Sequence, residues 1–218
     1  MAIVHSMDQG SPQRSSVISV GNMSDIRSDL IDSRHLRRSV GQFVTGVTVV
    51  TYDLDGSPRG VTVNSFTSVS VDPPLILVSI ARSARAAAGL SGAPLVVNVL
   101  AADQLDLARH FAGRSVQDME IPWSPHHHPS RLRGAVAWIE CRPYAEVEAG
   151  DHILFLSRVT SHRTVSREPL LFQTGRFRLV GDHVGTQPAT EASLPAWLLI
   201  SQAQMLAEAG VTPHDATV

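Results

Sequence analysis

The chain has 218 residues, a length that suits one domain with additional segments at its ends. Its hydrophobic fraction of 43% and charged fraction of 17% exclude a disordered or fibrous protein and favour a globular one. A net charge of −2 provides no broad basic surface, so we expect no nucleic-acid partner and no binding to an anionic membrane surface.

Cellular location is indicated by two further features. No apolar run approaches the roughly 18 residues that a membrane-spanning helix needs, and we expect no membrane segment. Cys141 is the single cysteine, which excludes an internal disulfide framework and fits a reducing compartment. We therefore expect a cytoplasmic protein.

Three segments are predicted along the chain. Residues 1–24 are rich in Ser, Gly and Gln without periodicity and are expected to form a disordered leader. Residues 25–184 hold the periodic patterns of a folded domain. Residues 185–218 form a C-terminal extension, in which "LPAWLLISQAQMLAEAG" has the apolar spacing of a helix.

The first half of the domain alternates strand and helix signals. Apolar spacing predicts a first helix over 28–43, and "DLDGSP" supplies the turn of a hairpin between strands at 47–52 and 59–63. Short, continuous apolar runs at 74–80 and 94–100 are typical of strands buried on both faces. Between and after these runs we expect short helices, over 83–92 with Ser83 as N-cap and over 101–113.

The second half is dominated by strands. A proline- and histidine-rich loop covers 114–133, and strand patterns follow at 135–141, 144–150, 152–165 and 175–181. The regular strand-helix-strand alternation of a doubly wound sheet is missing, so the fold class is mainly β with short helices (α+β), built on a barrel-like core. Neither a Gly-x-Gly-x-x-Gly motif nor a phosphate-binding P-loop occurs, which excludes Rossmann-type nucleotide binding.

The stretch "TVNSFTSVSVDPP" at 62–74 concentrates hydroxyl groups and one amide. One interpretation is an edge strand whose serines face water. The other is a groove in which hydroxyl, amide and backbone N–H groups bind a phosphate or a polar heterocycle, with Phe66 as an apolar wall.

Two shorter motifs are open to a functional and a structural interpretation. Ser83 stands between Arg82 and Arg85 and is either part of an anion site or an ordinary helix cap. His152 follows Gly150-Asp151 at the mouth of a strand, where Asp151 can orient the imidazole, although a lone histidine is more often structural.

Other chemistries have little support. The "HHH" of the loop lacks a cysteine pair or a His-Glu-x-x-His helix, so we expect no metal site. Cys141 lies in a strand pattern with no base beside it and is interpreted as a buried thiol. A Gly-x-Ser-x-Gly nucleophile elbow does not occur.

Six ordered motifs over residues 36–181 resemble the flavin reductase family, the FMN-binding split-barrel reductases of two-component flavin monooxygenases. They are "LRRSVGQFVTGVTVVT", "GVTVNSFTSVSVDPPLILVSI", "LVVNVLAADQLDLARHFAG", "LRGAVAWIECR", "AGDHILFLSRV" and "PLLFQTGRFRLVG". The resemblance implies a homodimeric split β-barrel that uses NADH or NADPH to reduce FMN or FAD. It also implies a transient partner, a monooxygenase or halogenase that receives the reduced flavin.

The resemblance also implies site residues. His152 matches the histidine near the nicotinamide. The matching flavin contacts are Thr45, Gly46, Val47, Thr62, Val63, Asn64, Ser65, Phe66, Thr67, Ser79, Ala81, Ser83, Arg85, Asn98, Val99 and Leu100. The chain departs from the pattern at Met119, where the family often has phenylalanine, and in the variable segment 82–85, which leaves the choice between FMN and FAD open.

Two alternatives remain beside the reductase. The first is a non-catalytic FMN-binding or electron-relay protein, which would not need the Gly-Asp-His segment ending at His152. The second is a pyridoxamine-phosphate-oxidase-like enzyme on a related barrel. It would need more basic residues than the 18 Lys and Arg present, many of which are scattered or terminal.

Overall fold

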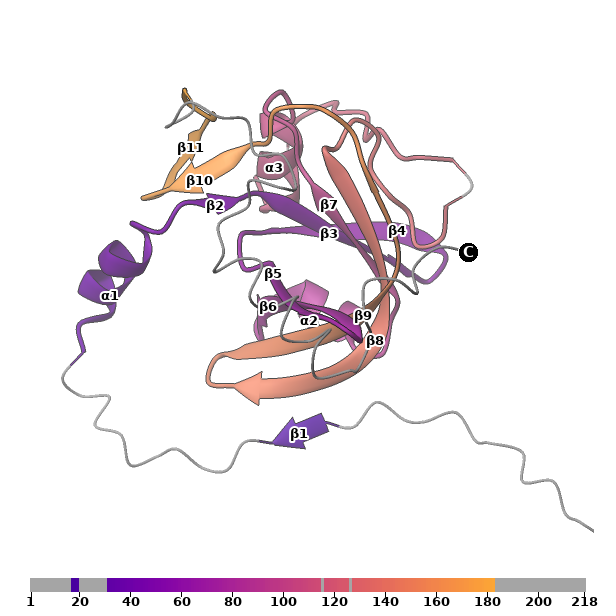
Figure 1. The fold of residues 1–218 in the computed structure, drawn as a ribbon, viewed down its shortest axis with the longest axis horizontal. Coiled ribbons are helices and arrows are strands. Elements are labelled where there is room, and N and C mark those ends of the chain that lie inside the picture. Colours follow the sequence, from indigo (N-terminus) through magenta and orange to yellow (C-terminus); the bar gives the residue numbers. More distant parts are fainter. Residues whose placement is uncertain (1–16, 20–30, 115, 126, 183–218) are drawn as a thin grey trace, which may run out of the picture. The chain divides into compact units, whose positions relative to one another are not determined.

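The structure is a computed structural model that describes residues 17–19, 31–114, 116–125 and 127–182 (Figure 1). The chain divides into two units, residues 1–180 and 181–218, and the helices and strands of the structure belong to the first. The helix expected in the C-terminal extension lies outside the described residues. So does the leader, except that Val17–Ser19 form a short strand, β1, paired in parallel with β8.

One large sheet dominates the first unit, in the order β4-β3-β7-β8-β9-β6-β5. Apart from β1, neighbouring strands are antiparallel. The bounds are β3 Thr48–Leu54, β4 Ser57–Val63, β5 Thr67–Val71, β6 Pro74–Ala81, β7 Leu95–Val99, β8 Ala137–Ala149 and β9 His152–Thr164. Edge strand β4 contacts β6, so the sheet curls back on itself without closing its hydrogen-bond ladder. The expected mainly β, barrel-like fold is confirmed.

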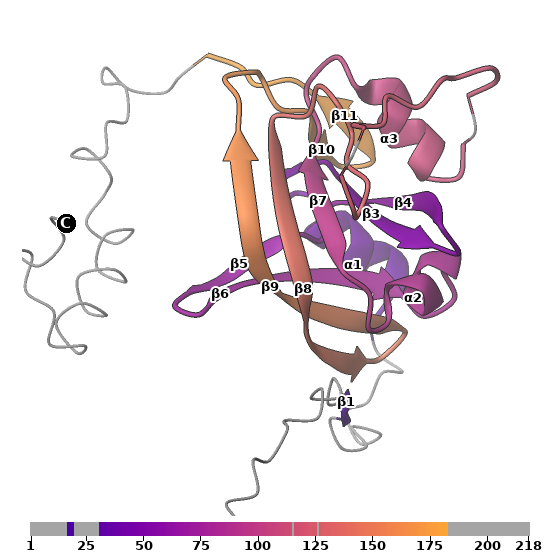
Figure 2. The same ribbon diagram turned by 90° about the vertical axis from the view of Figure 1, so that its right-hand side faces the viewer.

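Smaller elements complete the unit. A second sheet joins β11, β10 and β2 in that order. Figure 2 shows the long neighbouring strands β8 and β9 and places α2 beside β4, with which it is in contact. The remaining bounds are β2 Thr45–Gly46, β10 Leu171–Gln173, β11 Arg176–Arg178, α1 Ser33–Val40, α2 Arg85–Leu90 and α3 Leu105–Phe111. None of these helices has the length and apolar character that crossing a membrane requires.

Two hydrophobic cores share strand β3. Val50 and Tyr52 point into one core with residues of β6, β7 and α2, whereas Val49 packs into the other with α3. This explains the unbroken β-branched run of β3, because a strand buried on both faces has no solvent-facing positions for polar side chains. Strand β7 is likewise buried along most of its length, as its apolar pattern predicts.

Local turn chemistry agrees with the sequence at the hairpin between β3 and β4. Asp55 and Gly56 adopt φ angles of 51° and 71°, the left-handed conformation that a tight two-residue hairpin turn requires. The expected hairpin is therefore confirmed, with strands slightly longer than the β-branched runs alone suggested.

Several boundaries differ from the predictions. Helix α1 begins only at Ser33, where Asp32 Oδ1 accepts a hydrogen bond from the Arg34 N–H at 2.7 Å. Helix α2 has Ala84 as its N-cap, so the prediction of Ser83 as the capping residue was wrong. The two strands predicted on either side of Pro143 are one strand, β8, whose register against β9 shifts at that proline.

Candidate functional site

An open groove of about 590 Å3 lies between α1, the turn joining β4 to β5, and β10. Its wall combines apolar side chains with a few polar ones, the usual composition of a small-molecule site. The lining residues are Leu36, Arg37, Val40, Gly41, Phe43, Thr45, Asn64, Ser65, Phe66, Thr67, Phe172 and Thr174.

The turn between β4 and β5 resolves the two interpretations of the hydroxyl-rich stretch. Strand β4 ends at Val63 and β5 begins at Thr67, so Asn64–Phe66 leave the sheet and line the groove instead. For these three residues the groove interpretation therefore agrees with the structure, and the edge-strand interpretation does not. Farther along, Ser68 is exposed on edge strand β5, as the water-facing interpretation expects.

Ser65 holds this turn in place. Its Oγ donates to the Ser79 carbonyl at 2.8 Å and accepts from the Ser79 N–H at 3.1 Å, which ties the turn to β6. Phe66 packs against the barrel core while still bordering the groove. The serine hydroxyl is thus engaged within the protein, and its contribution to the groove is to position the neighbouring residues.

Two other polar groups of the groove have no partner among the described residues. The exposed Asn64 side chain makes no hydrogen bond to any described residue, so its donors and its acceptor are free. Thr45 Oγ1 is buried and unpaired within the described part of the chain. Because buried polar atoms are nearly always hydrogen-bonded, an unpaired hydroxyl in the groove wall is a feature that a bound ligand would explain.

The groove's remaining wall comes from α1, which has no buried residue. Leu36, Val40 and Phe43 are 50%, 64% and 76% exposed, although each has an apolar side chain. These wall residues were not among the predicted site residues. The signal in the sequence that could have identified them is the helical spacing of the apolar residues Leu36 and Val40.

His152 is the first residue of β9 and lies opposite Ala81 of β6. Its Nδ1 is 2.7 Å from Asp151 Oδ1. The hydrogen bond and charge of His152 hold the pKa of Asp151 below its ordinary value, and the charge of Arg37 in the groove wall contributes in the same direction. His152 is not among the residues that line the groove; its Nδ1 is engaged, and its Nε2 has no partner among the described residues.

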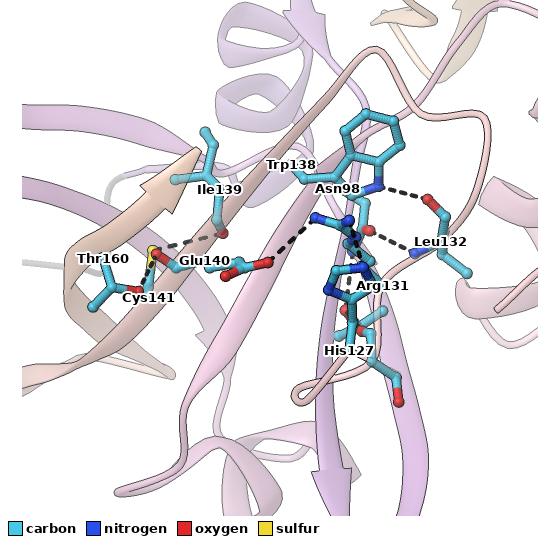
Figure 3. A network of polar contacts seen from close by, with 11 residues as sticks. Asn98, His127, Arg131, Leu132, Trp138, Ile139, Glu140, Cys141 and Thr160 are labelled. Carbon is cyan, nitrogen blue, oxygen red and sulfur yellow. Dashed lines mark hydrogen bonds and ion pairs between the residues drawn. The ribbon is translucent and has the colours of Figure 1, made fainter. Parts of the chain in front are cut away.

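Other predicted contacts lie elsewhere. Asn98 has no exposed surface: its Nδ2 donates to the Val49 carbonyl at 2.8 Å, and its Oδ1 accepts from the Leu132 N–H at 2.8 Å (Figure 3). Leu100 is also fully buried. The structure does not bring these two residues to the groove, because their side chains are already enclosed by the protein.

The remaining predicted contacts divide by position. Five of them line the groove: Thr45, Asn64, Ser65, Phe66 and Thr67. Gly46 follows Thr45 on β2, and Ser79 is hydrogen-bonded to Ser65 but does not line the groove itself. Val47 and Val63 pack in or against the cores, Val99 lies within β7, and Thr62 donates to the Ala108 carbonyl at 2.8 Å. Ala81 pairs with His152, whereas Ser83 and Arg85 lie at the start of α2.

The histidine-rich loop is anchored to strands β3 and β8. His128 Nδ1 lies 3.1 Å from Asp53 Oδ2. Arg131 pairs with Glu140 at 3.3 Å, and its guanidinium lies over the Trp138 ring, 5.6 Å from the ring centroid (Figure 3). Within the described ranges, no three metal-ligating side chains gather at one point.

Cys141 is buried beside this loop, as predicted. Burial and the charge of Glu140 raise the pKa of its thiol to about 12. The thiolate that nucleophilic chemistry requires is therefore strongly disfavoured.

Comparison with known proteins identifies relatives in both sequence and fold. A family model described as the flavin reductase like domain matches residues 40–181. The NADH-dependent FAD reductase of Streptomyces globisporus is 43% identical over 164 residues, which are 69% of this chain and 89% of that protein. The FMN reductase (NADH) SmoA of Agrobacterium fabrum is 40% identical over 149 residues, 67% of this chain and 85% of the relative.

A solved structure shares both fold and sequence. It is BorF, the flavin reductase component of a bacterial two-component tryptophan halogenase, with a TM-score of 0.63 and 40% identity. The match covers 70% of this chain and 100% of BorF.

Proposed function

This chain belongs to the flavin reductase like family, and we propose that it reduces FMN or FAD with NADH as the hydride donor. The observation that carries the proposal is the groove, in which the free amide of Asn64 and the unpaired hydroxyl of Thr45 lie beside Phe66. The two curated relatives described above are named as NADH-dependent reductases of FAD and FMN.

The groove fits a flavin by chemistry and size. An isoalloxazine ring has two apolar faces and a polar edge, and the wall offers Phe66 and Phe172 for a face and Asn64 for the edge. Its volume of about 590 Å3 lies within the range of ligand pockets. When bound, flavin and nicotinamide supply the hydride chemistry, and the protein supplies binding and orientation.

Three tasks fall to the chain's own residues. Asn64 hydrogen-bonds the polar edge of the ring, and Ser65 keeps the turn in register with β6. His152, oriented through Nδ1 by Asp151, presents Nε2 to the carboxamide of the nicotinamide. This orientation restricts the donor to a reactive geometry without proton transfer by the imidazole.

A homodimer is part of the proposal. An unpartnered helix with apolar residues as exposed as those of α1 is unusual for a monomer, and a second copy of the chain would cover it. The groove lies directly against this helix, so dimerisation would also complete its outer wall.

The reduced flavin is proposed to pass to a partner monooxygenase or halogenase in the cytoplasm. Support comes from BorF, which is the reductase component of a two-component halogenase. The net charge of −2 gives no support to a nucleic-acid or membrane partner.

Anaerobic reduction of flavin by NADH tests the proposal. Purified protein is mixed with NADH and with FMN, FAD or riboflavin, and the loss of the flavin's visible absorbance is followed, with NADPH as a second donor. We expect rapid bleaching of at least one flavin. Tight flavin binding without bleaching would instead support the non-catalytic carrier or relay.

A further inference from the structure

The wall of the groove carries one positive charge, that of Arg37 on α1. Every other residue that lines the groove is neutral. The Arg37 side chain is exposed, and it forms no ion pair with a carboxylate of the described residues. Its guanidinium is therefore available to a ligand in the groove, as a charge and as a donor of several hydrogen bonds.

The end of α1 that carries Arg37 is fixed against the rim of the groove. The Gly41 N–H donates to the Arg37 carbonyl at 2.9 Å, and the Gly41 carbonyl accepts from the Thr174 N–H at 2.9 Å. A Cβ atom at Gly41 would lie 2.9 Å from the Arg37 carbonyl oxygen and 3.7 Å from Thr174 Cα, so glycine permits this close approach. Because Thr174 also lines the groove, the backbone of Arg37 has a defined place beside it.

A purely local role for Arg37 has to be separated from a role in the groove. Arg37 and Arg38 both lie in the last turn of α1, where positive charges stabilise the negative end of the helix dipole. Only Arg37 lines the groove. An effect on the helix should therefore be shared by both arginines, whereas an effect on a bound ligand should belong to Arg37.

The charge of Arg37 also acts on the turn before β9. It contributes to the lowered pKa of Asp151, although the hydrogen bond and charge of His152 contribute more. Arg37 thus has two candidate partners: a ligand in the groove and the Asp151 carboxylate. These partners predict different results when Arg37 is replaced.

The proposed reaction creates a negative charge that Arg37 can stabilise. Hydride transfer breaks the C4–H bond of NADH and forms an N5–H bond on the flavin, and the products are NAD+ and a reduced flavin with one negative charge. That charge is shared by N1 and the C2 carbonyl of the ring. Oxidised flavin is neutral at this edge, so a cation beside it favours the reduced form.

We propose that the Arg37 guanidinium contacts the N1 and C2-carbonyl edge of the flavin and stabilises the charge that reduction places there. The inference rests on the proposed function for the identity of the ligand. Water screens an exposed guanidinium, and a flavin ring that covers the groove wall displaces part of this water and strengthens the attraction. Arg37 would therefore bind reduced flavin more tightly than oxidised flavin and raise the reduction potential of the bound ring.

The test measures the affinity of each oxidation state separately. Arg37→Gln removes the charge, Arg37→Lys keeps it, and Arg38→Gln removes the neighbouring charge of α1 that does not line the groove. For each variant and the wild-type protein, Kd is measured for oxidised FMN and riboflavin and for the same flavins reduced with dithionite. Anaerobic ultrafiltration gives the free flavin, which is quantified after reoxidation in air. KM for NADH is measured in parallel.

We expect Arg37→Gln to raise Kd for reduced flavin about tenfold more than Kd for oxidised flavin, equal to about 1.4 kcal/mol. The potential of the bound flavin should fall accordingly, by about 30 mV for this two-electron couple. Riboflavin and FMN should show the same difference, because the charge acts on the ring. Arg37→Lys should lose less than Arg37→Gln, and Arg38→Gln should match the wild-type protein.

Three results would overturn the inference. An equal rise in Kd for both oxidation states would assign Arg37 to the shape of the wall or to assembly. A rise for FMN without one for riboflavin would assign it to the phosphate. A rise in KM for NADH with unchanged flavin affinities would assign it to Asp151.

Failure of the proposed function gives a different result. A wild-type protein that binds flavin but does not reduce it with NADH would contradict the reductase, and the dithionite titrations would still decide the role of Arg37. A wild-type protein that binds neither form of either flavin would overturn both.

Discussion

At the scale of single residues, the polar side chains of the groove differ in whether the protein already uses them. Asn64 is exposed and unbonded among the described residues, whereas the hydroxyl of adjacent Ser65 makes two hydrogen bonds to Ser79. A free group contributes to ligand binding directly, and an engaged group contributes through the shape that it maintains. Substitutions of Asn64 and Ser65 should therefore differ in their effects on flavin affinity and on melting temperature.

Replacing Asn64 with alanine should weaken flavin binding by about 1 kcal/mol or more, the cost of a hydrogen bond lost from a bound ligand. The melting temperature should stay the same, because no protein contact is removed. Ser65→Ala should lower both flavin affinity and melting temperature. Fluorescence titration and thermal unfolding separate the two effects, with exposed Ser68→Ala as the control. Equal flavin affinity in all four proteins would remove the turn from the binding site.

His152→Ala should lower kcat/KM for NADH by about tenfold, a loss of about 1.4 kcal/mol of transition-state stabilisation. Flavin affinity and melting temperature should be unaffected, because the pair with the largely exposed Asp151 stabilises the fold very little. Stopped-flow reduction measures the rate, and His162→Ala, farther along the same strand, is the control. If His152→Ala reduced flavin with NADH at the wild-type rate, His152 would have no role in positioning the nicotinamide.

At the scale of elements, one carboxylate of β3, that of Asp53, contacts the histidine-rich loop at two points. Asp53 accepts from the Ser130 N–H at 3.3 Å and pairs with His128 at 3.1 Å. Burial alone would raise the pKa of Asp53, but the hydrogen bonds from His128 and Ser130 outweigh it, and the pKa lies below its ordinary value. A carboxyl group with a lowered pKa in the folded state stabilises that state when it is ionised.

The contribution of Asp53 to the free energy of unfolding should decrease as the pH falls. It is fully present above the ordinary pKa of 3.8 and is lost as the pH falls through the lower folded-state value. Asp53→Asn should therefore reduce the free energy of unfolding by about 1 kcal/mol at neutral pH. The difference from wild type should shrink towards zero in strong acid. Urea unfolding across pH measures this difference, with Asp55→Asn in the exposed turn as the control variant.

At the scale of the whole molecule, the apolar side chains of α1 are the main feature that one chain leaves unexplained. Helix α1 has no buried residue, and Phe43 just beyond it is 76% exposed. Exposed apolar surface of this kind marks an interface. Because the same side chains line the groove, assembly and flavin binding should be coupled.

Leu36→Asp and Phe43→Asp should therefore produce a monomer with weaker flavin binding, since a charge in an apolar interface is strongly unfavourable. Analytical ultracentrifugation at micromolar concentration gives the mass, and flavin titration gives the affinity. Tyr144→Asp alters another exposed aromatic residue, on β8, and should leave the dimer intact. A wild-type protein that sediments as a monomer would contradict the dimer outright.

The sequence by itself determined the types of the longer strands, the β3–β4 hairpin, the mainly β class and the family. These follow from local patterns, such as β-branched runs and an Asp-Gly turn, and from motifs whose order along the chain is itself informative. Boundaries were less predictable where a tertiary contact overrides a local preference. The segment between Val63 and Thr67 is one example. Two hydrogen bonds between Ser65 and Ser79 hold it as a turn between β4 and β5.

Only the tertiary structure decided which polar side chains are available to a ligand. Asn64 and Asn98 have the same amide and both match family motifs, but Asn98 is enclosed and bonded to the backbone of Leu132, 34 residues away. A pocket beside α2 likewise joins Arg59, Arg85 and Phe111, which come from three elements that no local pattern connects. The availability of a polar group depends on partners distant in sequence, and those partners are known only once the chain is folded.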